Sequence, residues 1–249
     1  MYILGINIKN IKIEEVKTNI DKINEEFEDK GPQELLQWAF DTYREKIILA
    51  SSLGLEDQVL TDISVKIYPE VHIFFLDTGR LNQETYNVLA KSMEKYKIKY
   101  EIYFPKAEEI EIFEVDFGPN AFYQSIELRH ECCQIRKIEP LQRALKGYTA
   151  WITGLRRKQN VTRADTMKVE WDDVNNLIKI NPLADWCVLD VTGYITKYNV
   201  PYNVLFDRGY TSVGCAPCTR PIKLGQDPRA GRWWWEAPEK RECGLHQKN

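Results

Sequence analysis

The stretch Val71-His72-Ile73-Phe74-Phe75-Leu76-Asp77-Thr78-Gly79-Arg80 shows the pattern that decides the fold. A nearly continuous apolar run ends at a polar loop that contains glycine, which is typical of a buried strand in a parallel sheet. The same pattern occurs at Ile47-Ile48-Leu49-Ala50, before Ser51, and at Ala150-Trp151-Ile152-Thr153, before Gly154. We therefore predict an α/β fold whose mostly parallel sheet carries helices on both faces.

Apolar residues at helical spacing occupy the intervals between these strands. We expect helices over about 13–28, 33–45, 55–67, 82–96 and 191–198, and a strand over 100–104. One further short helix is expected before Ala150, and Val169 to Ile180 is predicted to form a hairpin added to the sheet. The chain reads as a single domain over 1–249, with an N-terminal helical extension (1–30), an α/β core (31–210) and an irregular C-terminal segment (211–249).

Composition and charge limit the classes of protein to consider. The 249 residues are 43% apolar, and 34 basic against 37 acidic residues give a net charge of −3, which does not favour a nucleic-acid partner. No apolar stretch approaches the roughly 20 residues that cross a bilayer. The first residues lack the basic region of a signal peptide, so we expect a cytoplasmic protein with reduced thiols.

Three strand-end loops carry groups suited to anions, and ligands of open parallel sheets bind beyond the carboxyl ends of the strands. Ser51-Ser52-Leu53-Gly54 offers hydroxyls and backbone amides at a helix N-terminus. Leu76-Asp77-Thr78-Gly79-Arg80 is similar, and Thr153-Gly154-Leu155-Arg156-Arg157 adds guanidinium groups. The first loop lacks the glycine spacing and lysine of a P-loop, and by itself it also fits a serine-capped helix. Together the three loops predict a nucleotide or other anionic substrate.

The six cysteines divide into two kinds. Cys132-Cys133 and Cys215-Ala216-Pro217-Cys218 are pairs, as in metal or cluster sites, whereas Cys243 stands alone in Arg241-Glu242-Cys243-Gly244-Leu245-His246. Four thiolates suit zinc and iron–sulfur alike, although adjacent cysteines are unusual in zinc sites. A lone cysteine near basic groups suits a nucleophile. Cys187 is interpreted as a core cysteine.

These motifs resemble the sulfonucleotide reductases. The resemblance rests on the loops that begin at Ser51, Leu76 and Thr153, on the tail around Cys243 and on the paired cysteines, and it extends from about residue 33 to the C-terminus. It implies the adenine-nucleotide hydrolase-like (PP-loop-type) fold. It further implies that Cys132, Cys133, Cys215 and Cys218 hold a 4Fe–4S cluster, as in the branch that reduces adenosine 5′-phosphosulfate (APS).

The resemblance also implies roles for the remaining site residues. Cys243 would attack the sulfur of APS to give an S-sulfocysteine and AMP, and thioredoxin would then release sulfite. The predicted substrate-binding residues are Ser51, Ser52, Leu53, Gly54, Leu76, Thr78, Lys137, Gly154, Arg156, Arg229, Arg232 and His246. Lys137, four residues after Cys133, is predicted to lie between cluster and substrate. Glycines and prolines after residue 210 favour a mobile catalytic segment.

Other interpretations remain open at this stage. The substrate could be the 3′-phosphorylated nucleotide PAPS, or the chain could be an ATP-dependent enzyme that thiolates tRNA, although its loop usually reads Ser-Gly-Gly-x-Asp-Ser. A non-enzymatic zinc module would leave the tail around Cys243 and the three loops unexplained. A thioredoxin-like redox pair at Cys215 and Cys218 is not favoured, because no strand plainly leads into a helix there. Trp233-Trp234-Trp235 are interpreted as packing anchors. A homo-oligomer is possible, and the sequence does not specify one.

Overall fold

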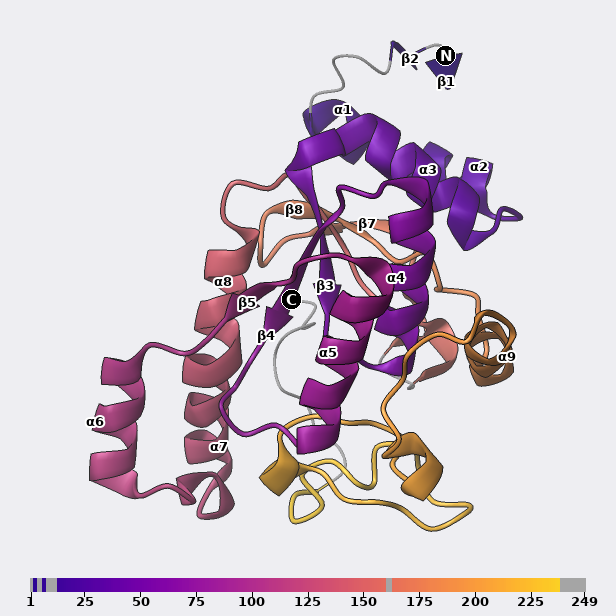
Figure 1. Cartoon of the computed structure of the whole chain (residues 1–249). Coiled ribbons are helices and arrows are strands. Elements are labelled where there is room, and N and C mark those ends of the chain that lie inside the picture. The colour runs from indigo at the N-terminus through magenta and orange to yellow at the C-terminus, as the bar shows by residue number, and fades with distance from the viewer. Residues whose placement is uncertain (1, 4–5, 8–12, 160–162, 238–249) are drawn as a thin grey trace.

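The computed structural model describes residues 2–3, 6–7, 13–159 and 163–237, and its centre is a six-stranded sheet (Figure 1). The strands lie in the order β5-β4-β3-β6-β8-β7. Five are parallel, and the edge strand β7 pairs antiparallel with β8. The sheet is therefore mostly parallel, as predicted, with the 169–180 hairpin at its edge. The strands are β3 (Ile47–Ser51), β4 (His72–Leu76), β5 (Glu101–Tyr103), β6 (Ala150–Ile152), β7 (Val169–Asp172) and β8 (Leu177–Ile180); β1 (Tyr2–Ile3) and β2 (Ile6–Asn7) form a separate ribbon.

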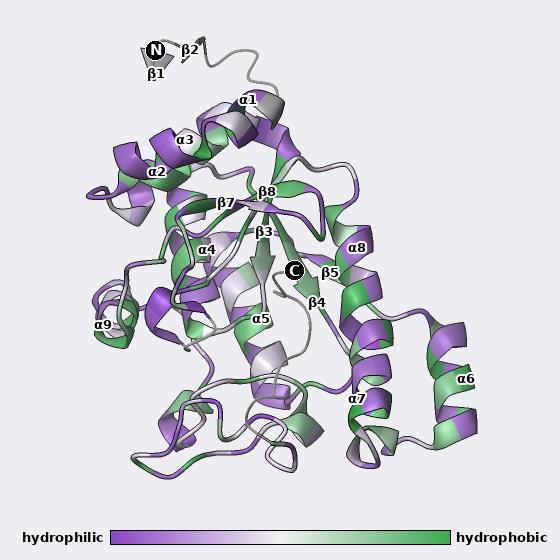
Figure 2. Cartoon of the chain, turned by 180° about the vertical axis from the view of Figure 1, so that it is seen from behind, coloured by the Kyte–Doolittle hydropathy of each residue, from purple (hydrophilic) through white to green (hydrophobic). Residues whose placement is uncertain are grey.

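Alternating side chains of the strands build two cores, because successive residues of a strand point to opposite faces. Leu49, Ile73 and Ile152 join the larger core, with residues of α3, α4, α5 and α9. Ile48, Phe74 and Trp151 pack with Leu141 and Leu145 of α8 on the other face. Figure 2 shows β3 and β4 as apolar strands between these helices. The helices are α3 (Pro32–Tyr43), α4 (Leu55–Ile67), α5 (Gln83–Tyr96), α8 (Glu139–Leu145) and α9 (Val188–Tyr198), with short turns η2 (Arg44–Lys46), η5 (Arg157–Gln159) and η7 (Phe206–Arg208).

The N-terminal extension packs beside edge strand β7. The helix predicted over 13–28 is two helices, α1 (Ile13–Thr18) and α2 (Ile20–Phe27), separated at Asn19, whose side-chain amide donates to the Glu15 carbonyl at 2.7 Å. Asn24 of α2 exchanges two hydrogen bonds with the backbone of Val169. The buried Lys168 ammonium donates to the carbonyls of residues 27, 28 and 30. These bonds fix the extension to the core.

The segment between β5 and β6 differs from the prediction of one short helix. It contains α6 (Ala107–Phe117), η3 (Ala121–Tyr123), α7 (Ile126–Cys133), a π-helical turn η4 (Gln134–Ile138) and then α8. Gly118 ends α6 with a φ of 82°, and Ser125 caps α7 by accepting the Leu128 N–H at 3.2 Å. Helical periodicity is weak in this segment because its apolar residues pack around the paired cysteines as well as against the sheet.

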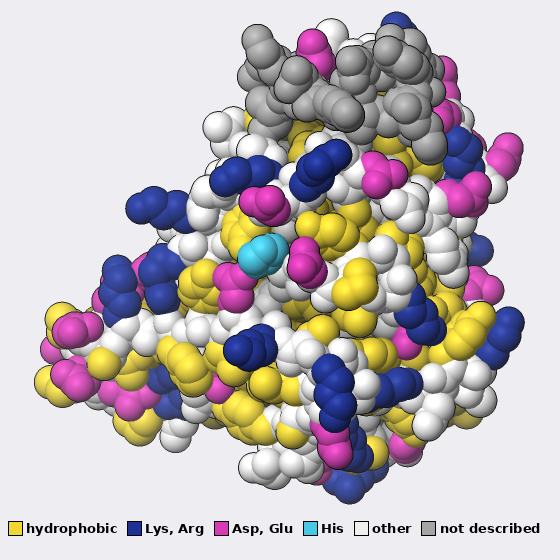
Figure 3. All heavy atoms as spheres, turned by 45° about the horizontal axis from the view of Figure 1, so that its top comes forward, with side chains coloured by type: hydrophobic (Ala, Val, Ile, Leu, Met, Phe, Trp, Pro, Cys, Tyr) yellow, Lys and Arg dark blue, Asp and Glu magenta, His cyan; other side chains and the backbone are white. Residues whose placement is uncertain are grey.

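The C-terminal segment lies beyond the carboxyl ends of the strands, where the arrowheads of β3 and β4 point in Figure 1. It is mostly irregular, with the turn η8 (Ala216–Cys218) and an isolated bridge between Thr219 and Arg232. No helix among the described residues is long and apolar enough to span a bilayer. Basic and acidic side chains are interspersed over the face shown in Figure 3, which agrees with the balanced charge of the sequence.

Candidate active site

The topology of the sheet places the predicted loops together. Strands β3 and β6 are neighbours, and the chain leaves them in opposite directions along the sheet, which is the switch point where such folds bind ligands. A cavity of about 1180 Å³ opens there. Its wall includes most of the described residues predicted to bind substrate: Ser51, Ser52, Gly54, Leu76, Thr78, Lys137, Gly154, Arg156, Arg229 and Arg232.

Leu53 is the described member of that set that lies outside the cavity wall. Its side chain is 1% exposed and packs in the larger core. The residue adopts a φ of 61°, and its N–H donates to Ser51 Oγ at 3.2 Å. Leu53 thus shapes the loop through its backbone and its anchorage, while the polar groups on either side of it face the cavity.

Asp57 in the first turn of α4 organises this loop, and the prediction of site residues omitted it. Its carboxylate accepts the Ser52 N–H at 2.7 Å and the Ser52 hydroxyl at 2.6 Å. Burial raises the pKa of Asp57 to about 6 and the neighbouring Glu56 charge adds to the rise, although the bonds from Ser52 oppose it. A Cβ atom at Gly154 would overlap the Asp57 carboxylate, so glycine is required where β6 leaves the sheet.

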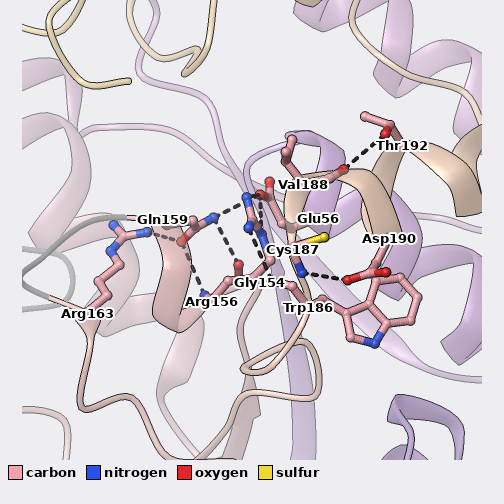
Figure 4. A network of polar contacts seen from close by, with 10 residues as sticks. All are labelled: Glu56, Gly154, Arg156, Gln159, Arg163, Trp186, Cys187, Val188, Asp190 and Thr192. Atoms are coloured by element: carbon pink, nitrogen blue, oxygen red, sulfur yellow. Dashed lines mark hydrogen bonds and ion pairs between the residues drawn. The ribbon is translucent and has the colours of Figure 1, made fainter. Parts of the chain in front are cut away.

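Arg156 lines the cavity with a guanidinium that already has an acidic partner (Figure 4). Glu56 Oε1 accepts its Nη2–H at 2.6 Å and its Nε–H at 2.8 Å. Gln159 donates to the same oxygen at 2.9 Å, and Arg163, also on the cavity wall, donates to Gln159. The sequence prediction missed Glu56, Gln159 and Arg163. Glu56 lies two residues after Gly54 of the first loop, but nothing in the sequence pairs it with an arginine a hundred residues away.

Basic residues of the C-terminal segment reach the same cavity. Arg229 and Arg232 line it together with Lys137 of η4. Arg232 is 7% exposed, and its Nη1–H donates to Ser212 Oγ at 3.2 Å. Gly214 lies against this guanidinium, because a Cβ atom there would approach Arg232 Nη2 to 2.5 Å. The cavity therefore has polar strand-end loops on one side and cationic side chains on the other.

The four paired cysteines also meet, in a second and smaller cavity. They come from the end of α7 and from η8, all are at most 9% exposed, and all are free thiols: Cys132, Cys133, Cys215 and Cys218. Burial raises the pKa of Cys132, and burial with the nearby Cys215 raises that of Cys218 to about 12, against the opposing charges of Lys137 and Arg232. Among the described residues, no three or more His, Cys, Asp or Glu side chains are arranged so that they could hold a single metal ion.

The lining of this smaller cavity suits an anionic group. Its charged members are all cationic within the described part of the chain: Arg80, Arg129, Arg136 and Lys137. Among the residues that the structure describes, the Nε–H of Arg136 and the Nε1–H of Trp233 are buried donors that find no acceptor. Buried donors are costly unless something accepts their hydrogen bonds. Sulfide and thiolate sulfurs of an iron–sulfur cluster are such acceptors, and four buried thiols supply its usual ligands.

The remaining cysteine and histidine candidates are Cys243, His246 and Cys187. Cys243 and His246 lie outside the residues that the structure describes. The interpretation of Cys187 as a core cysteine is wrong, because this half-buried residue precedes α9 and lines the larger cavity (Figure 4). The small apolar side chain of cysteine suits the core and a helix N-terminus alike, so the sequence did not distinguish the two positions.

Comparison with known proteins agrees with this geometry. Residues 46–221 match the phosphoadenosine phosphosulfate reductase domain. The chain belongs to this reductase family. It is 50% identical to the adenosine 5′-phosphosulfate reductase of Allochromatium vinosum over 204 residues, which cover 82% of this chain and 80% of the relative. The enzyme of the same description from Burkholderia cepacia is 47% identical over 202 residues, 81% of each chain. The sulfonucleotide reductase family predicted from the sequence is thereby confirmed.

Solved structures support the family and the fold. A phosphoadenylyl-sulfate reductase from Candida auris, crystallised as a phosphate complex, superposes with a TM-score of 0.72 at 32% identity and covers 85% of this chain and 98% of that one. An FMN adenylyltransferase from Candida glabrata gives a TM-score of 0.54 at 14% identity, over 88% of this chain and 72% of the other, which concerns the fold alone. The predicted adenine-nucleotide hydrolase-like fold is confirmed for this member of the reductase family.

Proposed function

We propose that the protein reduces adenosine 5′-phosphosulfate to sulfite and AMP in sulfate assimilation. The observation that carries this proposal is the common wall of the two cavities: Lys137, Cys215 and Trp233 line both the cavity at the strand ends and the four-cysteine cavity. A nucleotide site and a sulfur-rich site in direct contact suit the reduction of a sulfonucleotide. The relatives at about 50% identity carry the corresponding name.

The proposed substrate orientation follows from the two sides of the larger cavity. The adenosine would lie toward the strand-end loops at Ser51 and Gly154, where polar backbone groups and small residues permit close approach. The phosphosulfate would lie toward Lys137, Arg229 and Arg232, since converging cations stabilise both its charge and that of the departing phosphate. His246 belongs to the same proposed set through the resemblance alone.

We propose that the four paired cysteines hold a 4Fe–4S cluster. Burial of four thiols beside Arg129, Arg136 and Lys137 is favourable when the thiols are ionised and bound, because the cations then compensate the negative charge. Such a cluster, when bound, would supply a fixed negative charge behind Lys137 and would hold α7 and η8 together. Lys137 is 8% exposed and lines both cavities, so its charge can act on the cluster and on the substrate.

The chemical step proposed for this chain belongs to Cys243. Its thiolate attacks the sulfur of the substrate, a sulfur–sulfur bond forms, the bond between sulfur and the phosphate oxygen breaks, and AMP departs with the bonding electrons. A dithiol reductant such as thioredoxin then attacks the sulfur of Cys243, becomes a disulfide and releases sulfite. The two electrons come from the dithiol, so these protein residues complete the reaction without electron transfer elsewhere. A reducing cytoplasmic setting suits this chemistry.

Competitive turnover tests the assignment of substrate. Purified protein is supplied anaerobically with equal APS and PAPS and with thioredoxin, and AMP and 3′,5′-bisphosphate are quantified. Formation of AMP in excess supports APS as the substrate, whereas preferential consumption of PAPS would support the second substrate, which the Candida auris relative is named for. Iron and sulfide are measured in the same sample, and zinc without sulfide would contradict the cluster.

A further inference from the structure

Trp233 forms the aromatic part of the wall between the two cavities. Its side chain is 1% exposed, and it is one of the largest fully buried side chains described. It lines the four-cysteine cavity and the substrate cavity alike. The residue also packs in the apolar cluster that contains all four paired cysteines. Any change in this ring therefore reaches both sites.

Four cationic side chains gather around the indole of Trp233. The charged groups lie 4.5–5.9 Å from the centre of the ring, and they belong to Arg232, Arg129, Lys137 and Arg229. The negative potential of an aromatic face attracts cations, and tryptophan attracts them best among the aromatic residues. Three of the four cations line the substrate cavity, and Arg129 lines the cysteine cavity.

The backbone at Trp233 is held in an unusual conformation. Its φ is 40°, in the left-handed region that a bulky residue rarely adopts without support. Support comes from two hydrogen bonds, since its N–H donates to the Cys218 carbonyl at 3.2 Å and its carbonyl accepts from Glu236 N–H at 2.9 Å. Glu236 in turn binds the buried Arg129. The fold thus places this ring against the last cysteine of the pair at some conformational cost.

The neighbouring tryptophans lie in different surroundings. Trp235 packs on Phe122 and Tyr123, and Trp234 is partly exposed beside Tyr123 with the Arg220 guanidinium over its ring. These contacts fit packing anchors, as the sequence predicts. Trp233 differs because its ring faces cations of two sites and its buried Nε1–H has no acceptor within the described part of the chain.

We infer that Trp233 is a positioning residue whose ring holds Lys137, Arg229 and Arg232 in place for the phosphosulfate group. The inference rests on the proposed function. The ring would not contact the reacting atoms; it would attract the three cations and so hold them converged before the substrate arrives. Its loss would therefore weaken recognition of the anionic part of the substrate and leave recognition of adenosine unchanged.

The test compares Trp233→Phe and Trp233→Leu in a Cys243→Ser background, which binds substrate without turnover. Affinities for APS and for adenosine are measured anaerobically by calorimetry, together with iron and sulfide content. We expect APS to bind about threefold more weakly in the Phe variant, which keeps a poorer aromatic face, and about tenfold more weakly in the Leu variant. Adenosine affinity should stay at the parental value in both.

Trp234→Phe is the matched control, because it changes an adjacent tryptophan outside both cavities, and it should leave both affinities unchanged. Equal losses of APS and adenosine affinity would show a merely structural role and overturn the inference, as would parental APS affinity in the Phe variant with full iron and sulfide. Absence of APS binding in the parent would instead remove the proposed function itself. The Phe variant retains most of the bulk of the ring. Its affinities for APS and adenosine therefore test the inference even where the Leu variant fails to fold.

Discussion

Removal of the Glu236 carboxylate should destabilise the protein far more than removal of an ordinary surface charge. Glu236 Oε1 and Oε2 accept the Arg129 Nε–H and Nη2–H at 2.8 and 2.7 Å, and the two side chains are only 1% and 2% exposed. Breaking a buried pair from one side leaves the Arg129 guanidinium buried without the carboxylate that accepts two of its hydrogen bonds, which costs about 3–5 kcal/mol. That loss is a large share of the roughly 5–15 kcal/mol that stabilises a typical domain.

The assay is anaerobic urea unfolding of Glu236→Ala, with Glu84→Ala as control. The control removes the partner of Arg208, whose side chain is 61% exposed, so it should cost about 0–1 kcal/mol. The double variant Arg129→Met with Glu236→Leu should recover most of the lost stability, because neither charge of this pair then remains buried alone. A loss below about 1 kcal/mol in Glu236→Ala would contradict this prediction, since other groups around the buried guanidinium would then compensate its charge.

Three further predictions concern the loops and the N-terminal extension. Burial raises the pKa of Asp57 from 3.8 to about 6 in the folded protein. Its contribution to stability is therefore full below pH 3.8 and is lost as the pH rises through 6. Relative to Asp57→Asn, the unfolding free energy of the parent should fall by roughly 2 kcal/mol between pH 4 and 7 in urea titrations. Gly154→Ala should abolish adenosine binding in calorimetry, because the added methyl overlaps Asp57, whereas Gly193→Ala adds its methyl in open space. Lys168→Met should cost about 2–3 kcal/mol and expose the extension to limited proteolysis, since the ammonium binds three backbone carbonyls; unchanged proteolysis would contradict that anchoring role.

The sheet and the position of the cavity were predictable from local sequence. Apolar runs that stop at Ser51, Asp77 and Thr153 mark strands whose carboxyl ends must lie on one edge, and the structure places them there. The sequence also predicted that the four paired cysteines lie together, because two close cysteine pairs in one chain are typical of a shared metal or cluster site. Both inferences depend on short-range patterns that survive in any tertiary context.

Features that depend on distant partners were not predictable. The ion pair of Arg156 with Glu56 joins the loop after β6 to the first turn of α4. The sequence around either residue therefore does not indicate the other. The helices from Ala107 to Leu145 pack partly around the cysteines, which obscures their periodicity. Burial of Trp233 among four cations also follows from tertiary structure alone, whereas its sequence context of three tryptophans suggests only packing.

We propose that Cys243, the lone cysteine of the tail, accepts the SO₃ group of the nucleotide beside the four-cysteine cavity. Anaerobic incubation of the iron-loaded protein with APS, followed by intact mass measurement, tests it most directly, with Cys243→Ser as the control. We expect a mass increase equal to one SO₃ group in the parent, its absence in the variant, and its disappearance when thioredoxin is added. Absence of the adduct from the parent, or its presence in Cys243→Ser, would contradict this role of Cys243.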